Sequence, residues 1–413
     1  MSASAPIAST NVTGKKRYFV DVTATYFQGG RGGIPRVARS LVEAFRRRPD
    51  IEVIPFVQAG ERFYRVDDGN LSRTRQGAML LRRLRAAMRV HDYPIAPLYS
   101  IANSAWGRLN AAWTFLLALC GTRTAIDDFA AGDVVLLTYV PRFATFERVL
   151  CKANRGATVA CIVHDLFPLQ YPQQFIPEVR RIFKQGTLVQ FRVSDIVLAI
   201  SDRTARAVRD YQKQNGFNQP VTTVYLGADP GKTRPRRKRD IPTLLSVGTC
   251  EPRKNYAYAL SICEKLWAAG EPLHYVVVGA IEPSMPHVAA ALTGHPEYGR
   301  RLFHYPNADD DTLGDLYASS DFLLSVSVDE GFGLPAMEAW QHGLPPICSD
   351  IEVYRELRPD ALFIPLGDAG TAAEAIRHAL RARDGVVASP ERPHAYRSWD
   401  ECADELRAAI EAL

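Results

Sequence analysis

Two glutamates, Glu330 and Glu338, stand eight residues apart around a glycine-rich segment and are the most distinctive candidates for chemistry in this sequence. The segment contains Gly331, Gly333 and Pro335, and it follows an apolar run that predicts a strand. A strand, a glycine-rich turn and a helix N-terminus form an anion site, because free backbone N–H groups and the helix dipole point at the ligand. Eight helical residues rise about 12 Å, which suits one acid on a sugar and the other on a ribose across a diphosphate. A solvated acidic helix start is the alternative.

Other charged side chains at predicted strand ends suit the same ligand. Arg253 and Lys254 follow the strand-like run 243–248, where fixed positive charge would stabilise a departing nucleoside diphosphate. His164 and Asp165 end another apolar run. A histidine there can contact a sugar hydroxyl or the acceptor, and the aspartate can orient it or act as a base on an acceptor hydroxyl. Solvated charges and a structural histidine are the alternatives for each pair taken alone.

Together these segments resemble the family-4 retaining glycosyltransferases, which have the two-domain GT-B fold and an E-x7-E signature. In that family the first glutamate contacts the donor sugar, the glycine-rich turn lies on the diphosphate and the second glutamate holds the ribose. The family often places an arginine where this sequence has Thr249, so its second cation must come from Arg253 or elsewhere. The resemblance implies catalytic roles for His164, Asp165 and Glu330. It implies donor binding by Arg253, Lys254, Gly331, Phe332, Gly333, Leu334 and Glu338.

A second glycine-rich loop lies near the start of the chain. Gly32 and Gly33 precede Ile34-Pro35-Arg36-Val37, which resembles bacterial polysaccharide glycosyltransferases with a Gly-Ile-x-Arg-Val pattern. The dinucleotide fingerprint G-x-G-x-x-G is not satisfied, because Pro35 takes its third position. We therefore expect Gly32 and Gly33 on the acceptor or the donor diphosphate. The same resemblance makes GDP-mannose the first donor to consider, followed by UDP- and dTDP-sugars.

Short apolar runs alternate with helical stretches along most of the chain, a pattern typical of parallel βαβ units. The predicted strands are 17–23, 51–57, 133–140, 158–164, 195–200, 221–225, 243–248, 274–279, 301–305, 321–326, 346–349 and 361–364. We expect an α/β protein of the GT-B type, with two Rossmann-like doubly wound domains facing a central cleft. The expected parts are an acceptor-side domain at 1–230, a linker at 231–240, a nucleotide-sugar domain at 241–394 and a helix at 395–413 that crosses back to the N-terminal domain.

The charge is small overall and uneven along the chain. Fifty basic and 45 acidic residues give a formal net charge of +5 over 413 residues, which does not favour a nucleic-acid-binding protein. Basic residues gather in the 231–240 segment, for which a patch that binds nucleic acid or anionic lipid is the alternative to a linker. They also gather in an insertion at 72–108, whose amphipathic pattern fits either an anionic membrane surface or an ordinary covering helix.

No metal site is expected from the sequence. The nine histidines lack ligand spacing, and the D-x-D at 309–311 precedes a helical pattern in which aspartate serves as an N-cap. The seven scattered cysteines fit a reducing compartment, and the polar N-terminus lacks the apolar core of a secretory signal. We expect a cytoplasmic protein without cofactor or metal, and leave open its attachment to the inner face of the plasma membrane.

The expected function is a retaining, metal-independent glycosyltransferase. It would move a sugar from a nucleoside diphosphate donor to a lipid-linked or oligosaccharide acceptor, such as a glycan on polyprenyl diphosphate, in bacterial surface polysaccharide biosynthesis. An epimerase or hydrolase of nucleotide sugars and a non-catalytic nucleotide-sugar-binding scaffold are the alternatives.

Overall fold

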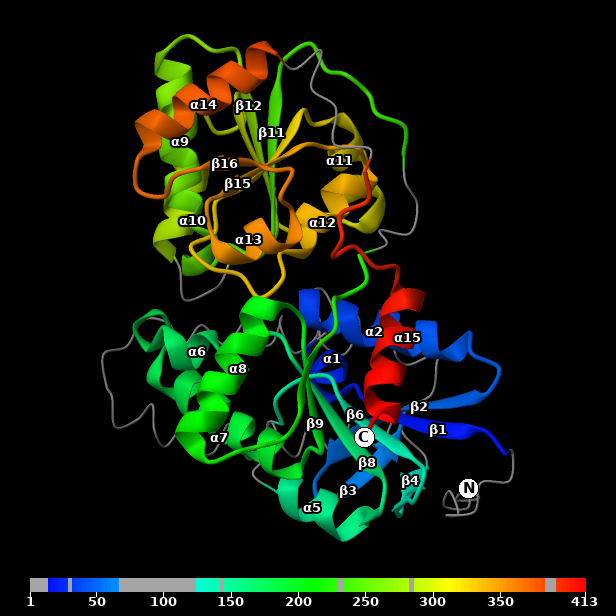
Figure 1. Ribbon diagram of the computed structural model, residues 1–413. Coiled ribbons are helices and arrows are strands. Elements are labelled where there is room, and N and C mark those ends of the chain that lie inside the picture. The colour runs from blue at the N-terminus through cyan, green and yellow to red at the C-terminus, as the bar shows by residue number, and fades with distance from the viewer. Residues whose placement is uncertain are drawn as a thin grey trace, which may run out of the picture. The chain divides into compact units, whose positions relative to one another are not determined.

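The computed structural model describes residues 14–28, 32–66, 124–141, 145–228, 234–281, 286–382 and 391–413. The chain divides into two compact units (Figure 1). Unit 1 contains Met1–Ala199, Ala205–Val224 and Trp399–Leu413, and unit 2 contains Ile200–Thr204 and Tyr225–Ser398. The basic insertion at 72–108 lies outside the described residues.

Unit 1 is built on a mostly parallel sheet. Within the described residues this sheet has eight strands in the order β10-β9-β8-β6-β1-β2-β3-β4. The strands are β1 (Lys16–Asp21), β2 (Ile51–Ala59), β3 (Arg62–Arg65), β4 (Ala125–Ile126), β6 (Val134–Leu137), β8 (Thr158–Val163), β9 (Ile196–Ala199) and β10 (Val221–Thr223). A separate parallel pair joins β5 (Phe129–Ala130) to β7 (Asn154–Arg155). Central strands such as β6 are buried at every residue, as expected for strands covered by helices on both faces.

The helices of unit 1 mostly connect these strands. They are α1 (Thr23–Gln28), α2 (Gly33–Arg46), α5 (Phe146–Ala153), α6 (Phe167–Gln170), the short 3₁₀ helix η1 (Pro172–Gln174), α7 (Pro177–Val193), α8 (Asp202–Asn215) and α15 (Trp399–Glu411). The first three residues of α8 fall in unit 2.

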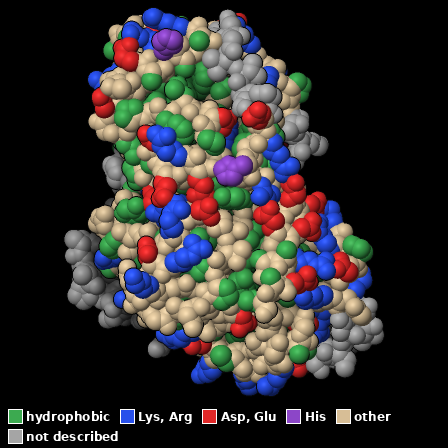
Figure 2. Space-filling view, in the orientation of Figure 1, with side chains coloured by type: hydrophobic (Ala, Val, Ile, Leu, Met, Phe, Trp, Pro, Cys, Tyr) green, Lys and Arg blue, Asp and Glu red, His purple; other side chains and the backbone are tan. Residues whose placement is uncertain are grey.

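The C-terminal helix α15 packs against α2 of unit 1, as the sequence predicts. Arg47 Nε lies 2.9 Å from Asp400 Oδ1, and Arg48 Nη2 lies 2.8 Å from Asp404 Oδ2. Figure 2 shows basic and acidic side chains intermixed over these two helices. Complementary charge and a buried face on α15, which includes Trp399, therefore hold the end of the chain on unit 1.

Unit 2 is a second doubly wound layer. Its sheet, in the described part of the chain, has six parallel strands in the order β13-β12-β11-β14-β15-β16. The strands are β11 (Thr243–Val247), β12 (His274–Val278), β13 (Leu302–Tyr305), β14 (Phe322–Ser325), β15 (Pro346–Ser349) and β16 (Leu362–Ile364). The helices are η2 (Pro252–Lys254, 3₁₀), α9 (Tyr256–Ala268), α10 (Pro286–Thr293), α11 (Asp310–Ser319), α12 (Leu334–Gln341), α13 (Glu352–Leu357) and α14 (Ala369–Arg381). All twelve strands predicted from the sequence overlap observed strands, which confirms the α/β class.

The basic segment predicted as a linker is anchored to unit 2 where the structure describes it. Arg234 lies 2.6 Å from both Asp311 and Asp315 of α11, and Arg237 lies 2.5 Å from Asp315. Residues 235–240 are exposed, but their backbone also bonds to α11 through the Arg237 N–H. Because Arg234 and Arg237 face acidic partners, this part of the segment is not an unpaired basic patch.

Two smaller findings concern the remaining sequence expectations. Asp309 is the N-cap of α11 and accepts a hydrogen bond from the Thr312 N–H at 2.8 Å, which confirms the predicted cap. Among the described residues, no helix combines the length and the apolar character needed to cross a membrane.

Candidate functional site

The candidate residues of unit 2 gather where two neighbouring strands end. Arg253 and Lys254 belong to η2, after β11, and Glu330 follows β14. Strands β11 and β14 are adjacent and parallel, so the segments that follow them leave the sheet at the same edge, where ligands of such sheets bind. The structure thus brings together residues that lie 76 positions apart in the chain.

The three side chains form one ion cluster. Glu330 Oε2 lies 2.5 Å from Arg253 Nη1, and Glu330 Oε1 lies 2.5 Å from Lys254 Nζ. Ser327 Oγ donates a hydrogen bond to Glu330 Oε1 at 2.7 Å, and Glu251 contacts the other end of the Arg253 guanidinium at 2.7 Å. One carboxylate therefore fixes two cations in place before any ligand arrives.

The charge state of Glu330 follows from this arrangement. Its side chain is buried, and burial alone would raise its pKa, but the charges of Arg253 and Lys254 outweigh that effect and lower the pKa to about 2. Glu330 is therefore ionised at neutral pH, and its one negative charge balances one of the two cations that it holds.

Lys254 also depends on a close approach to Gly248 at the end of β11. Gly248 has a φ of 143°, and a Cβ built there would lie 3.3 Å from Lys254 Cε. Tyr256 Oη donates to the Gly248 carbonyl at 2.8 Å. A residue with a side chain at 248 would therefore be strained in its backbone and would crowd the lysine.

The turn that follows Glu330 presents backbone donors. Among the described residues, no recorded hydrogen bond uses the N–H of Gly331, Phe332, Gly333 or Leu334. Gly333 is the N-cap of α12, with Pro335 in the first turn, so these amides stand at the start of a helix. Unused N–H groups at a helix N-terminus suit an anion.

Gly333 is required for this turn on two grounds. Its φ is 77°, and a Cβ there would lie 2.6 Å from Cε1 of the buried Tyr354. We expect Gly333→Ala to lower the free energy of unfolding of unit 2 by about 2–4 kcal/mol, from left-handed strain and overpacking combined. Gly367 is a matched control, because its φ is 86° and nothing lies within 4 Å of the position that a Cβ would take there.

Denaturant unfolding of both variants measures this difference. Gly367→Ala should cost only the backbone strain, about 1–2 kcal/mol. Equal losses in the two variants would show that Tyr354 does not constrain the turn.

Glu338 lies on α12, whereas Glu330 precedes the helix. Because α12 begins at Leu334, the predicted helical spacing of the two glutamates is wrong. The left-handed backbone conformation of Gly333 interrupts helical geometry between the two glutamates. Glu338 is buried and accepts a hydrogen bond from Tyr317 Oη of α11 at 2.9 Å.

A histidine completes the surroundings of Glu338. His342 stacks on the Tyr317 ring with centroids 4.9 Å apart and planes at 4°. Burial, with the nearby charges of Arg236 and Arg234, lowers the pKa of His342 to about 4, so the imidazole is neutral at neutral pH. The aromatic pair therefore holds the Tyr317 hydroxyl against the carboxylate without adding charge.

A buried arginine bonds to the first turn of α12. Arg358 is fully buried, bonds the Ala336 carbonyl, and makes two 2.8 Å contacts with the Asp360 carboxylate. Because Ala336 is in the first turn of α12, this contact fixes the helix that carries Glu338.

The candidates His164 and Asp165 of unit 1 follow β8, which is the neighbour of β6 in the sheet. His164 Nε2 donates to the Thr138 carbonyl at 2.9 Å, since a carbonyl can only accept. Burial lowers the pKa of His164 to about 4, against the effect of this hydrogen bond. The neutral ring therefore carries its proton on Nε2 and keeps a lone pair on Nδ1.

The other predicted residues of unit 1 have local roles. Asp165 Oδ1 accepts a hydrogen bond from the Phe167 N–H at 3.1 Å, at the start of α6. Gly32 is the N-cap of α2 and Gly33 its first residue; both are exposed. Among the described residues, no recorded hydrogen bond joins either glycine to His164 or Asp165.

Three residues of these sites were not identified from the sequence. Ser327 stands three positions before Glu330, just after β14. Its position after a predicted strand could have identified it as a site residue. Tyr317 reaches Glu338 from a different helix, and Thr138 joins β6 to His164 through its backbone. No local pattern marks either contact.

The chain is similar to known glycosyl transferases in sequence and in fold. Residues 232–396 match the family described as Glycosyl transferases group 1. The serotype-specific mannosyltransferase WbdA of Escherichia coli is 30% identical over an alignment that covers 58% of this chain and 32% of that protein. The O-antigen chain mannosyltransferase RfbU of Salmonella typhimurium is 25% identical over 54% of this chain and 61% of its own length. The chain therefore spans about a third of the length of WbdA.

Solved structures share the fold at low sequence identity. HepE of Anabaena, solved in complex with UDP and glucose, has a TM-score of 0.61 and 15% identity over 97% of this chain and 100% of its own. Sucrose-phosphate synthase of Thermosynechococcus elongatus has a TM-score of 0.56 and 14% identity over 97% and 95%. These neighbours confirm the predicted GT-B fold. Residues 232–396 thus match the group 1 family of glycosyl transferases, in a chain with the GT-B fold.

Proposed function

We propose that this protein is a retaining, metal-independent glycosyltransferase that moves mannose from GDP-mannose to a growing glycan. The observation that carries the proposal is the cluster in which Glu330 holds Arg253 and Lys254 beside the unused amides of the Gly331–Gly333 turn. Two fixed cations and a helix N-terminus suit a diphosphate, because they stabilise the negative charge that develops when the sugar leaves. The relatives named as mannosyltransferases support the choice of sugar.

The roles of the individual residues follow from this assignment. Arg253, Lys254 and the turn amides bind the diphosphate, Glu330 orients the donor sugar and Glu338 holds the ribose. His164, neutral at neutral pH, offers the Nδ1 lone pair to a sugar hydroxyl. Charge stabilisation of the leaving group by arginine and lysine removes the need for a bound metal in this proposal.

The proposed acceptor is a glycan on a polyprenyl diphosphate, extended at the cytoplasmic face of the membrane. The support is the relative named as an O-antigen chain mannosyltransferase, of which this chain covers 61%. The oligosaccharide part of such an acceptor is the part that must reach the reacting sugar. UDP- and dTDP-sugars are the alternative donors. UDP-sugars come first among them, because HepE was solved in complex with UDP and glucose.

A panel of nucleotide sugars tests the donor assignment. A ligand that binds only the folded state stabilises it by RT ln(1 + [L]/Kd). We expect GDP-mannose to raise the Tm more than UDP-glucose, UDP-N-acetylglucosamine or dTDP-rhamnose at equal concentration. A larger shift with a UDP- or dTDP-sugar would replace the donor, and no shift with any of them would remove the proposed function.

Tyr317→Phe tests the proposed ribose contact of Glu338. The change deletes the 2.9 Å hydrogen bond to Glu338 and keeps the ring on His342. A hydrogen bond to a charged group contributes about 1.5–3 kcal/mol, so we expect GDP to bind roughly tenfold more weakly. In the wild type, 2′-deoxy-GDP should bind more weakly than GDP, and this difference should shrink in the variant.

Calorimetric titration of both nucleotides measures the effect, with Tyr305→Phe as a control because Tyr305 is exposed. If Tyr317→Phe weakens GDP and 2′-deoxy-GDP by the same factor, Tyr317 does not act through the ribose contact.

A further inference from the structure

A short segment of unit 2 reaches the glycine-rich turn from a distant part of the chain. Ile200–Thr204 contains the start of α8 and belongs to unit 2, whereas the rest of α8 belongs to unit 1. Ser201 lies in this segment, directly before the first residue of α8, and it is fully buried. Ser201 is not one of the residues proposed to bind the donor.

Two acidic residues of unit 2 hold this segment. The Glu356 carboxylate of α13 accepts hydrogen bonds from the Asp202 N–H at 2.7 Å and from the Arg203 N–H at 3.0 Å. Both donors stand in the first turn of α8, where N–H groups without a partner inside the helix favour a carboxylate. The Arg203 guanidinium pairs with Asp329, which directly precedes Glu330. The start of α8 is therefore fixed to the segment that leads into the glycine-rich turn.

The Ser201 hydroxyl makes one bond within its own segment and one to the turn. Its oxygen accepts from the Thr204 N–H at 3.1 Å, the bond expected of a helix N-cap. Ser201 Oγ also donates to the Gly331 carbonyl at 2.7 Å. Thr204 Oγ1 lies further away, 3.0 Å from Ser201 Oγ and 3.4 Å from the same carbonyl. Because a serine hydroxyl has a single proton, the shorter contact with Gly331 uses it.

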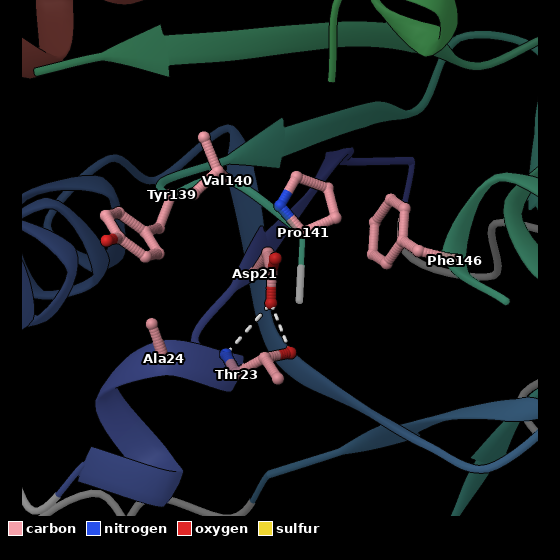
Figure 3. Close-up of a pocket in the computed structure, with 7 residues that line it drawn as sticks. All are labelled: Asp21, Thr23, Ala24, Tyr139, Val140, Pro141 and Phe146. Atoms are coloured by element: carbon pink, nitrogen blue, oxygen red, sulfur yellow. Dashed lines mark hydrogen bonds between the residues drawn. The ribbon is translucent and has the colours of Figure 1, made fainter. Parts of the chain in front are cut away.

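Another turn after a strand shows that capping alone does not need this proton. Asp21, the last residue of β1 in unit 1, accepts from the Thr23 N–H at 2.9 Å and from Thr23 Oγ1 at 2.5 Å (Figure 3). An ionised carboxylate can only accept hydrogen bonds. An aspartate would therefore cap α8 as well as Ser201 does, but it could not donate to the Gly331 carbonyl. The donated bond is the part of the Ser201 contacts that the helix itself does not require.

The bond to the Gly331 carbonyl orients the amide that follows it. The peptide between Gly331 and Phe332 is trans, so its carbonyl and the Phe332 N–H point in nearly opposite directions. Ser201 thereby turns the Phe332 N–H away from itself. This N–H is one of the turn amides that no recorded hydrogen bond uses among the described residues. The Phe332 ring is buried near Tyr225, with centroids 6.4 Å apart, so both sides of this amide are held before a ligand binds.

We propose that Ser201 is a positioning residue of the donor site, which holds the peptide between Gly331 and Phe332 so that the Phe332 N–H donates to the diphosphate. The proposal rests on the proposed function, because it takes a diphosphate as the ligand of the turn. Ser201 touches no ligand itself. Without its hydroxyl, the conformational freedom of Gly331 lets this peptide rotate. The diphosphate then loses one oriented donor, while the nucleoside part keeps its contacts.

Titration of nucleotides against the full chain separates positioning from a purely structural role. The probes are GDP, UDP and dTDP, each compared with its own nucleoside, and ligand-observed NMR measures the Kd values. We expect Ser201→Ala to weaken the tightest nucleoside diphosphate by about fivefold or more, the effect of one net hydrogen bond. The matching nucleoside should weaken by less than about twofold, because only the diphosphate meets the Phe332 N–H. A loss of stability alone would change both Kd values by the same factor or change neither.

Ser320→Ala is the matched control. Ser320 is also a buried serine of unit 2, and its Oγ donates to the Leu316 carbonyl at the same distance of 2.7 Å. It stands before β14, whereas the glycine-rich turn follows that strand. This variant should bind every probe as the wild type does. Ser201→Gly, in which glycine keeps most of the N-cap preference, gives the same comparison if Ser201→Ala does not fold.

The outcomes separate this proposal from the proposed function. If the wild type prefers a nucleoside diphosphate to its nucleoside and the Ser201 variants keep that preference, the role of Ser201 is overturned and the donor site stands. If the wild type binds no diphosphate better than its nucleoside, the diphosphate site is absent, which overturns both the role of Ser201 and the proposed function. A selective loss of diphosphate affinity, combined with no sugar transfer by the wild type, supports the role of Ser201 and removes the proposed reaction.

Discussion

Lys254→Ala is expected to reduce kcat/KM for the sugar donor by roughly 100- to 1,000-fold, the loss typical when one preorganised charge stabiliser is removed. Lys254 Nζ lies 2.5 Å from Glu330, and its side chain is only 12% exposed. Removing it leaves Glu330 compensated by Arg253 and Ser327 alone. The departing diphosphate would then meet one cation, Arg253, which already contacts both Glu330 and Glu251.

Steady-state release of nucleoside diphosphate in the presence of acceptor measures this loss. Lys265→Ala is the matched control, because Lys265 is an exposed lysine of α9, the helix that directly follows Lys254 in the chain. Its kcat/KM should equal that of the wild type. Transfer by Lys254→Ala at the wild-type rate would show that the cluster does not hold the leaving group.

The largest stability effect is expected from Arg17→Met in unit 1. The Arg17 guanidinium makes two contacts with the Asp133 carboxylate, at 2.8 and 2.5 Å, and both side chains are at most 5% exposed. Removing one partner of a buried pair leaves an uncompensated charge and costs about 3–5 kcal/mol. Asp133 would keep only the Ala130 N–H at 2.7 Å.

Thermal unfolding followed by calorimetry measures this effect as a fall in Tm of roughly 10 °C in the transition of unit 1. Arg181→Ala, which breaks an exposed pair with Glu178, should change the Tm little. The double variant Arg17→Met, Asp133→Leu should recover most of the loss, since neither charge then remains buried. A fall no larger than that of Arg181→Ala would contradict a structural role for the pair.

The central strands were predictable because each one is marked by the hydrophobicity of its own residues. A parallel strand covered on both faces is a continuous apolar run, and β6 and β8 are of this kind. Strand β3, Arg62–Arg65, was not predicted, because only Phe63 of its four residues is buried. Strands β4, β5 and β7 have two residues each and leave no periodic pattern.

The residues of the candidate site that follow strands could be predicted from the sequence. Glu330, Arg253 and Lys254 each follow an apolar run, and the adjacency of β11 and β14 then brings them together. The sequence did not reveal that one carboxylate holds both cations, since that contact depends on side-chain packing across the sheet. It also applied a helical spacing to Glu330 and Glu338, because the left-handed turn at Gly333 depends on the space beside Tyr354.

The partners of the basic segment could not be predicted for a related reason. Charges at 234–239 looked unpaired in the sequence, because the acids that meet them, Asp311 and Asp315, lie more than 70 residues further on. The excess basic charge of Arg234 and Arg237 in the sequence is therefore paired with acidic side chains in the fold.

The most direct test of the account is product analysis of GDP-mannose incubated with the full chain and an octyl α-mannobioside acceptor. Mass spectrometry should show acceptor carrying one added hexose, and NMR should show that the new linkage keeps the α configuration of the donor. Release of GDP should depend on the acceptor and fall with Lys254→Ala. Sugar released only to water, or no reaction of GDP-mannose, UDP-glucose or dTDP-rhamnose with this acceptor, would contradict the proposed transfer.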